Sequence, residues 1–185
     1  MTLRKKLQIT IVCLSVILCT LVTGTIAWLT DETTSIKNEF APSTINIELA
    51  ESENLDLQMV PGATIKKDPV ITVTANSEAC YVFVKIEKAN DFDNFMEYTM
   101  ADGWNELTGI TGVYYREVSA ADAAAGQGFP VLKDNQVTVK ANVTKAMMDA
   151  LYADTTKYPT LTFTAYAIQQ EGFGTAELAW AEIPK

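Results

Sequence analysis

Few side chains in this sequence of 185 residues are suited to catalysis. The chain has 23 acidic residues and three cysteines but no histidine. Without an imidazole, the Ser-His-Asp and Cys-His nucleophile arrangements, the H-E-x-x-H zinc helix and every histidine-ligated metal are excluded. Two carboxylates that face each other across a cleft can act as a catalytic pair, but the spacing of the acidic residues indicates no particular pair. We therefore predict that the protein is not an enzyme and binds no cofactor.

Oxygen ligands are concentrated in the segment 90–94, which reads Asn-Asp-Phe-Asp-Asn. Such a segment is typical of a loop, and Asp91 and Asp93 are weak candidates for a calcium site outside the cell. The segment is not an EF-hand, because Met96 stands at the sixth position counted from Asp91, where that loop requires glycine. We interpret it as a solvated loop, with the calcium site as the alternative.

Cys80 could be a reactive thiol and four aromatic residues could bind a ligand, but the neighbouring residues are typical of a protein core. Cys80 has apolar neighbours and no imidazole to activate its thiol, so we predict a small buried residue at the start of a strand. The aromatic residues could line a carbohydrate or partner site, but alternating aromatic residues on a β-sandwich mostly fill its core. They are Trp104, Tyr114, Tyr115 and Phe129.

The N-terminal part of the sequence has the pattern of a secretory signal peptide. A basic patch at residues 4–6 precedes a mostly apolar run over residues 7–22. Small residues then lead to Ala27, which predicts cleavage by signal peptidase between Ala27 and Trp28. The alternative is an uncleaved anchor, because the mostly apolar stretch 7–29 is long enough to cross a bilayer as a helix. In both cases the remainder of the chain faces the outside of the membrane.

The charge of the exported part excludes several classes of partner. Cleavage removes three of the 14 basic residues and no acidic residue, so the formal net charge changes from −9 to −12. Such an acidic surface argues against nucleic acid or anionic lipid as a partner, and leaves membrane contact only to an uncleaved signal. We predict three parts of the chain: a signal peptide over 1–27, a flexible mature N-terminal segment over 28–40 and one domain over 41–185.

Alternation of apolar and polar residues dominates the predicted domain. The stretch 81–86 is apolar on both faces as far as Lys85 and is predicted to be a central strand. Seven strands separated by turn residues predict an all-β fold, a jelly-roll-like antiparallel β-sandwich with a few short helices, preceded by the helix of the signal peptide. These strands are expected at 45–49, 55–59, 71–74, 81–86, 112–118, 136–143 and 160–168.

The short helices are recognised by their capping residues. Thr144 can cap a helix over residues 145–152, and Thr175 can cap another over residues 176–181. An alanine-rich stretch over 119–125 ends at a glycine and predicts a further helical turn. We expect these helices to close the ends of the sandwich.

Two stretches of the sequence resemble one group of exported proteins. The first comprises residues 24–31, 38–40 and the strand Ile45-Asn46-Ile47-Glu48-Leu49, and it is similar to the start of the TasA and camelysin group. The second runs from Val60-Pro61-Gly62 to Tyr81-Val82-Phe83-Val84-Lys85 and is similar to the next hairpin of that group. Residues 165–169 and 171–173 resemble its closing strand, whereas the resemblance is thin over residues 90–143.

The resemblance implies a structural function. It implies a signal cut by the dedicated signal peptidase SipW, and a jelly-roll subunit of fibres that form in a biofilm matrix or at the surface of a Gram-positive-type bacterium. In such fibres the mature N-terminal segment of one subunit completes a sheet of the next. Carried onto this chain, the donor is the segment 28–40, with Leu29, Ile36 and Phe40 as apolar anchors, and a minor fibre or surface protein is a further partner.

Two alternatives to a fibre subunit remain open at this stage. Some members of the group are described as camelysin-type metallopeptidases, and an endopeptidase is the second hypothesis, although the sequence has no recognisable zinc ligand set. A monomeric exported module that binds glycan or protein through the region of Trp104 and Tyr115 is the third. On the residues alone, without the resemblance, we interpret the segment 28–40 as a disordered leader.

Overall fold

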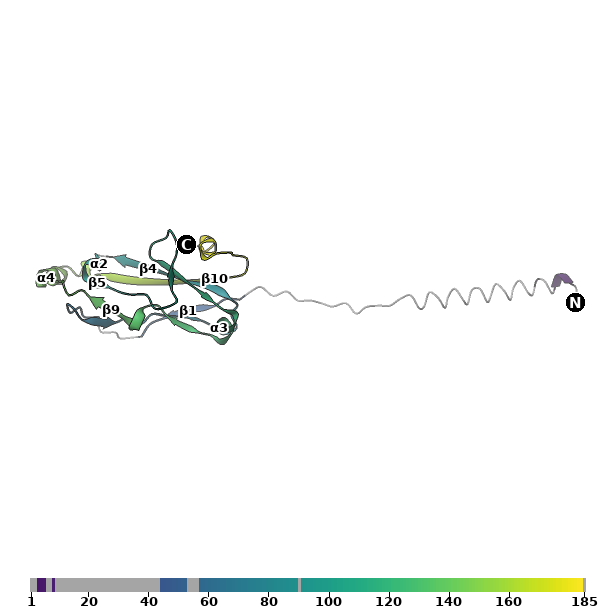
Figure 1. Cartoon of the computed structure of the whole chain (residues 1–185), viewed down its shortest axis with the longest axis horizontal. Coiled ribbons are helices and arrows are strands. Elements are labelled where there is room, and N and C mark those ends of the chain that lie inside the picture. Colours follow the sequence, from purple (N-terminus) through teal and green to yellow (C-terminus); the bar gives the residue numbers. More distant parts are fainter. Residues whose placement is uncertain (1–2, 6–7, 9–43, 53–56, 90, 185) are drawn as a thin grey trace. The chain divides into compact units, whose positions relative to one another are not determined.

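In a computed structural model of the chain, residues 3–5, 8, 44–52, 57–89 and 91–184 are described. By its internal contacts the chain divides into two units, Met1–Ala41 and Pro42–Lys185, and the second contains all the strands discussed below (Figure 1). Several predictions concern residues outside the described part and stay predictions: the cleavage site at Ala27 and Trp28, and the donor anchors Leu29, Ile36 and Phe40.

One layer of the domain is a four-stranded antiparallel sheet with the order β10-β4-β7-β6. The long strand β4 lies between two neighbours, as predicted, because both of its faces are apolar and buried. Val82 and Val84 face the larger core cluster, whereas Tyr81 and Phe83 face a smaller one on the other side. The strands are β4 (Cys80–Ala89), β6 (Asn105–Glu106), β7 (Val113–Val118) and β10 (Thr160–Gln169).

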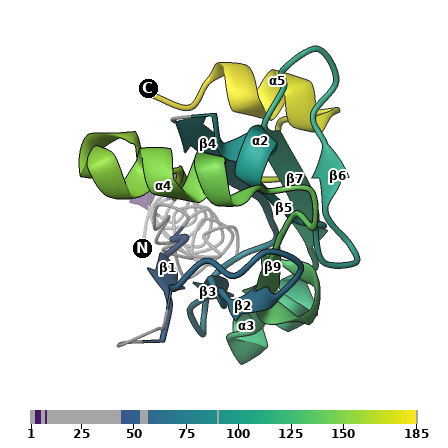
Figure 2. The same ribbon diagram turned by 90° about the vertical axis from the view of Figure 1, so that its left-hand side faces the viewer.

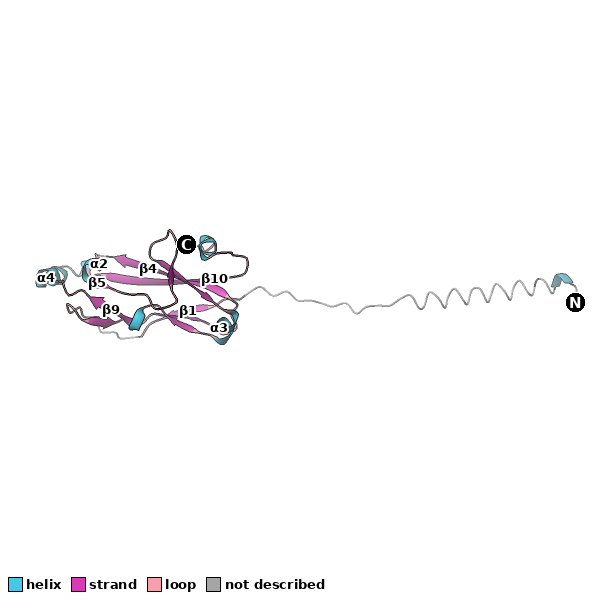
Figure 3. Ribbon diagram, in the orientation of Figure 1, coloured by secondary structure: helices cyan, strands magenta, loops and turns pink. Residues whose placement is uncertain are grey.

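Two three-stranded antiparallel sheets lie opposite this layer, with the orders β1-β3-β8 and β2-β9-β5 (Figures 2 and 3). Their inward side chains, among them Ile71, Val137 and Phe129, complete the larger core cluster with β4. The strands are β1 (Ile47–Ala50), β2 (Thr64–Lys66), β3 (Val70–Val73), β5 (Met96–Glu97), β8 (Gly128–Pro130) and β9 (Gln136–Val139).

Short helices follow the strands, and two of them begin at the predicted caps Thr144 and Thr175. The prediction that all of them close the ends of the sandwich was wrong for the last helix, whose Trp180 packs on Phe83 at the outer face of β4. The side-chain oxygens of Ser119, Thr144 and Thr175 accept hydrogen bonds from backbone amides three residues further on, at 3.2, 3.3 and 3.4 Å. These bonds satisfy amides that the first turn of a helix leaves without partners. The helices are α3 (Ala120–Ala125), α4 (Lys145–Ala153), α5 (Ala176–Ala181) and α2 (Phe92–Phe95), with 3₁₀ turns at Lys133–Asn135 and Thr155–Lys157.

The prediction of a mostly β, antiparallel fold is confirmed. The jelly-roll arrangement of the strands stays a prediction. Six predicted strands are present, but the one over 136–143 ends at Val139, because the chain turns there and the Val143 amide donates to the Lys140 carbonyl at 3.2 Å. The prediction for 55–59 was wrong in its described part, since residues 57–60 belong to no strand.

The interpretation of residues 90–94 as a loop was also wrong. Phe92–Phe95 form the single helical turn α2, and Asp91 precedes it with a left-handed backbone at φ 55°. Phe92 and Phe95 are both buried, and a spacing of three residues places two side chains on the same side of a helical turn. Burial of these two rings therefore explains the helix better than the polar residues around them.

Candidate functional site

The strand β10 has one side without a hydrogen-bonded neighbour, although β1 of the opposite layer also contacts β10. It pairs with β4 over its whole length, from Thr160 opposite Ala89 to Gln169 opposite Cys80, and among the described residues no strand pairs with its other side. The Gln170 amide donates to the Ala79 carbonyl at 3.0 Å, which fixes the alternation of hydrogen bonds along this pair. The even-numbered residues of β10 therefore bond to β4, and the odd-numbered residues turn their amides and carbonyls to the open side.

An apolar groove of about 880 Å³ lies beside the first residues of β10. Thr160 and Leu161 form one wall, and the segment 57–60 together with Ile65 of β2 forms another. Met148 and Leu151 of α4 line the groove at the end of the layers, where Figure 2 shows α4 crossing. A cavity of this size and apolarity is typical of a binding site.

Exposed apolar side chains gather around this groove. Eight large hydrophobic side chains are exposed in the described part of the chain. Half of them line the groove: Leu57, Val60, Tyr152 and Tyr158. Single exposed apolar residues are ordinary on a protein surface, but a contiguous apolar patch marks a site of interaction. The open edge of β10 and this patch therefore form one candidate site, which we call the edge groove.

Lys67 is the one charged residue among the described residues that line the edge groove. Its ammonium lies 2.7 Å from a carboxylate oxygen of Glu51, which follows β1, and 5.6 Å from the centre of the Phe163 ring of β10. The Lys67 side chain is 18% exposed. Lys67 thus connects the two layers of the sandwich at the inner end of the groove.

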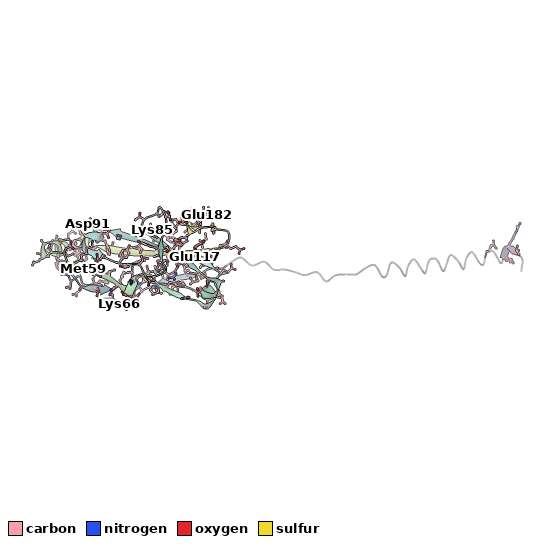
Figure 4. The ribbon with its side chains drawn as sticks, in the orientation of Figure 1. Met59, Lys66, Lys85, Asp91, Glu117 and Glu182 are labelled. Carbon is pink, nitrogen blue, oxygen red and sulfur yellow. The ribbon has the colours of Figure 1, made fainter. Side chains whose placement is uncertain are left out.

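The chain enters the domain at the end opposite to the edge groove. The Asn46 carbonyl accepts the Thr74 amide at 2.9 Å, and the Asn46 amide donates to the Ser77 hydroxyl at 3.3 Å, just before β4 begins. The start of β4 lies opposite the end of β10, whereas the groove lies at the start of β10. The ten residues of β10 separate these two ends by about 33 Å. In Figure 4, Met59 lies toward the groove end and Glu117 toward the other end.

Asp91 and Asp93, the candidates for a calcium site, belong to the turn at α2. Lys88 holds both carboxylate oxygens of Asp93, at 2.9 and 3.0 Å, and the Lys140 ammonium donates to the Asp93 carbonyl. Two ammonium groups next to these oxygens disfavour a cation. The described residues around Asp91 contain no group of three or more acidic, cysteine or histidine residues that could hold a metal ion.

Cys80, Trp104 and Phe129 lie in the core, as predicted, whereas Tyr114 and Tyr115 are only half-buried. Cys80 is fully buried, and burial raises the pKa of its thiol to about 11. Phe129 is buried as well. Trp104 is buried and donates from its indole nitrogen to the Pro130 carbonyl at 2.8 Å. Tyr114 packs partly against the larger core cluster and Tyr115 against the smaller one. The Arg116 guanidinium lies over the Trp104 ring, 5.3 Å from its centre, and only 8% of Trp104 is exposed.

The comparison with protein families agrees with the resemblance noted in the sequence. Residues 2–91, which include β1 to β4, match the family described as camelysin metallo-endopeptidase. Over these residues, just under half of its length, the chain is similar to the camelysin family. No curated protein and no solved structure matches it. In the described part of this camelysin-like chain, no helix is both long and apolar enough to cross a membrane.

The family description implies a metal, and the described residues do not fit one. The camelysin-like chain has no histidine, and its described part contains no cluster of three potential ligands. Several carboxylates already have partners of their own: Asp68 bonds to Ser52, and Asp149 pairs with Lys145 at 2.6 Å. Zinc sites in enzymes use three protein ligands, usually with histidine among them. We therefore derive no reaction step through a metal.

Sequence reasoning missed the edge groove. The alternating pattern of residues 160–168 predicted β10 correctly, but the pattern records only which face of a strand is buried. Lys67 was equally hidden, since it follows Lys66 in an ordinary polar stretch near a turn. A local signal existed only for the exposed tyrosines of the groove. Tyr152 lies near the end of α4, and Tyr158 follows the next 3₁₀ turn.

Proposed function

We propose that this protein is an exported structural subunit that polymerises by strand donation. The observation that carries the proposal is the open edge of β10 beside an apolar groove. An unpaired edge is a template for an added strand, whose backbone gains hydrogen bonds while its side chains fill the groove. In this view the donor is the segment 28–40 of a second copy, which is released when a SipW-type signal peptidase cuts between Ala27 and Trp28.

The donor segment has the length and composition that this site requires. Its 13 residues span about 43 Å when extended, which exceeds the length of β10. It contains no proline or glycine, and Ile36 and Phe40 share one face of an extended strand because they are four residues apart. Leu29 points to the opposite face, so we expect it to contribute less to filling the groove.

The positions of the groove and of the chain entry favour an open polymer. Each domain receives a strand at one end and continues into its own donor at the other, where Asn46 enters the fold. Such a head-to-tail contact is heterologous, and it generates filaments unless a rotation closes the ring. The fibre would form outside the membrane, at the cell surface or in a biofilm matrix, where a minor companion protein can bind the free edge at one end.

Truncation tests the donor. The mature chain from Trp28 is compared with a chain that begins at Ala41. The truncated chain keeps both core clusters, whose members lie between Ile45 and Ile183. We expect fibres in electron micrographs of the first protein only, with the same circular dichroism spectrum of the domain. Unchanged assembly of the truncated protein would refute the proposal.

A matched pair of substitutions tests the acceptor edge. Leu161 is odd-numbered, so its amide faces the open side of β10, and it lines the groove. Leu161→Pro removes that amide and the leucine side chain, whereas Leu161→Ala removes the side chain alone. Proline is tolerated near the start of an edge strand. We expect fewer fibres from Leu161→Pro than from Leu161→Ala, at equal content of folded monomer.

A camelysin-like endopeptidase is the second candidate, and the family description favours it. Its test is the digestion of casein by the purified mature protein, with and without a chelator. Digestion that stops on chelation and returns with added zinc would promote this candidate. The same preparation should be examined for fibres, because a peptidase does not require assembly.

A further inference from the structure

We propose that Lys67 sets the register of the donated strand by pairing with Glu32 of the second copy. This inference rests on the proposed strand donation and names the contact that selects the partner. Lys67 is the one charged residue among the described residues of the groove wall. Every other described residue there is apolar or uncharged, so an incoming strand meets a single fixed charge.

The Lys67 ammonium is placed where a strand added to β10 would pass. It lies 5.6 Å from the centre of the Phe163 ring, and Phe163 is an odd-numbered residue whose backbone polar groups face the open side. With the Lys67 side chain only 18% exposed, water screens its charge less than it screens a charge on the open surface. A charge in such a position discriminates strongly between incoming carboxylates and incoming ammonium groups.

The donor segment offers one carboxylate on the matching face. Side chains of an extended strand alternate, so the face that carries Ile36 and Phe40 consists of the even-numbered residues. Glu32 is the one charged residue on that face of the segment 28–40, whereas Asp31, Lys37 and Glu39 lie on the other. When Ile36 and Phe40 point into the groove, Glu32 therefore points the same way.

The spacing places the apolar anchor Ile36 at the groove once Glu32 meets Lys67. Ile36 lies four residues beyond Glu32, or about 13 Å along an extended strand. Four residues before Phe163 in the chain, just ahead of β10, is Pro159, which lines the groove. On the donor, four residues separate Glu32 from Ile36. On the acceptor, four residues likewise separate Phe163, which lies beside Lys67, from Pro159 in the groove wall. A slip by one residue would turn the other face to the groove: Asp31 or Thr33 would then take the place of Glu32, and Ser35 or Lys37 would take the place of Ile36, so the apolar anchor would be lost.

Pairing with Glu32 exchanges one carboxylate for another. In the monomer the Lys67 ammonium is paired with Glu51, which is itself 30% exposed, at 2.7 Å. Glu51 remains in contact with water when it is released, so no buried charge is left without a partner. The exchange therefore costs little, and it occurs only if the arriving strand brings a carboxylate to the same place.

A charge exchange between Lys67 and Glu32 tests the inference. The peptide 28–40, labelled with a fluorophore, is titrated with the domain that begins at Ala41, and binding is followed by fluorescence anisotropy. We expect Lys67→Glu in the domain, or Glu32→Lys in the peptide, to weaken binding by about tenfold or more. The two variants together should recover most of the loss. Fibre formation by the full mature chains should also be reduced in each single variant and largely restored in the double exchange.

Two controls separate the register contact from general charge effects. Lys66→Glu makes the same charge change next to Lys67, but Lys66 is paired with Asp68 and does not line the groove. It should leave binding of the peptide unchanged. Glu39→Lys in the peptide makes the charge change on the opposite face and should fail to rescue Lys67→Glu. Thermal unfolding of each domain variant shows whether the domain is folded, and Glu32→Lys lies outside the domain altogether.

The outcomes distinguish this inference from the proposed function. If the wild-type peptide binds and the mature chain forms fibres, but the single variants bind as well as the wild type, the Lys67 contact is refuted and strand donation stands. The contact is also refuted if the double exchange binds no better than the single variants. Absence of binding by the wild-type peptide, together with fibres from the truncated chain, refutes both.

Discussion

The guanidinium carbon of Arg116 lies 4.0 Å from the centre of the Phe129 ring and joins the two layers of the domain. Arg116 belongs to β7 in the four-stranded sheet, and Phe129 belongs to β8 in the opposite layer. The Trp104 ring lies on the same guanidinium at 5.3 Å. Burial lowers the pKa of Arg116, and its Nε has no hydrogen-bond partner among the described atoms. Contact with the two rings therefore dominates the setting of this side chain.

Replacing Arg116 should weaken the connection between the layers. A planar guanidinium stacks on aromatic rings, and a lysine ammonium does not, so Arg116→Lys is not conservative here. We expect a loss of about 1–2 kcal/mol in the free energy of unfolding, as for a partly desolvated cation–π contact. Urea denaturation followed by tryptophan fluorescence measures it. A value equal to that of the unchanged protein would mean that the stacking contributes nothing to stability.

The smaller core cluster should depend strongly on Phe83. Its side chain is fully buried, and its ring centre lies 5.2 Å from that of Trp180 on α5. Phe83→Ala leaves a cavity under this helix and should cost about 3–5 kcal/mol. Leu178→Ala is the matched control, because Leu178 is on the same helix but 59% exposed, and it should change stability by less than about 0.5 kcal/mol.

The Cys80 thiol should be unreactive in the folded protein. It is fully buried, and its pKa is raised to about 11, so almost no thiolate is present at neutral pH. A colorimetric thiol reagent should therefore react only after denaturant is added. Rapid reaction at pH 7 without denaturant would contradict the burial of this residue.

Acid should remove the contribution of Asp68 to stability. Hydrogen bonds from the Ser52 side chain at 2.6 Å and from Lys66 lower the pKa of Asp68 from 3.8 to about 2. A carboxylate with a lowered pKa in the folded state stabilises above pH 3.8, and this contribution is lost as the pH falls through about 2. The melting temperatures of the wild type and Asp68→Asn should therefore differ at pH 5 and converge near pH 2. A constant difference at all pH values would assign the effect to another cause.

Much of the local structure was determined by the sequence itself. Hydrogen-bonding side chains at Ser119, Thr144 and Thr175 mark the starts of three helices because each amide they satisfy lies only three residues away. The apolar run that forms β4 predicted a strand covered on both faces. Burial of Cys80 followed from its apolar neighbours. At the caps the interacting groups are close in sequence, and for β4 and Cys80 the signal is the apolar run itself, although distant residues provide the burial.

The tertiary structure alone decided which strand has an open edge and what lies beside it. Alternation along β10 specifies the face that is buried, but the lateral partner depends on hydrogen bonds to distant segments. The short strands β2, β5, β6 and β8 also depend on hydrogen bonds to distant segments, because their partners are β9, β7 and β3. Lys67 reaches Phe163 only because the two layers are stacked. The candidate site therefore arises from packing between distant parts of the chain, which no local pattern records.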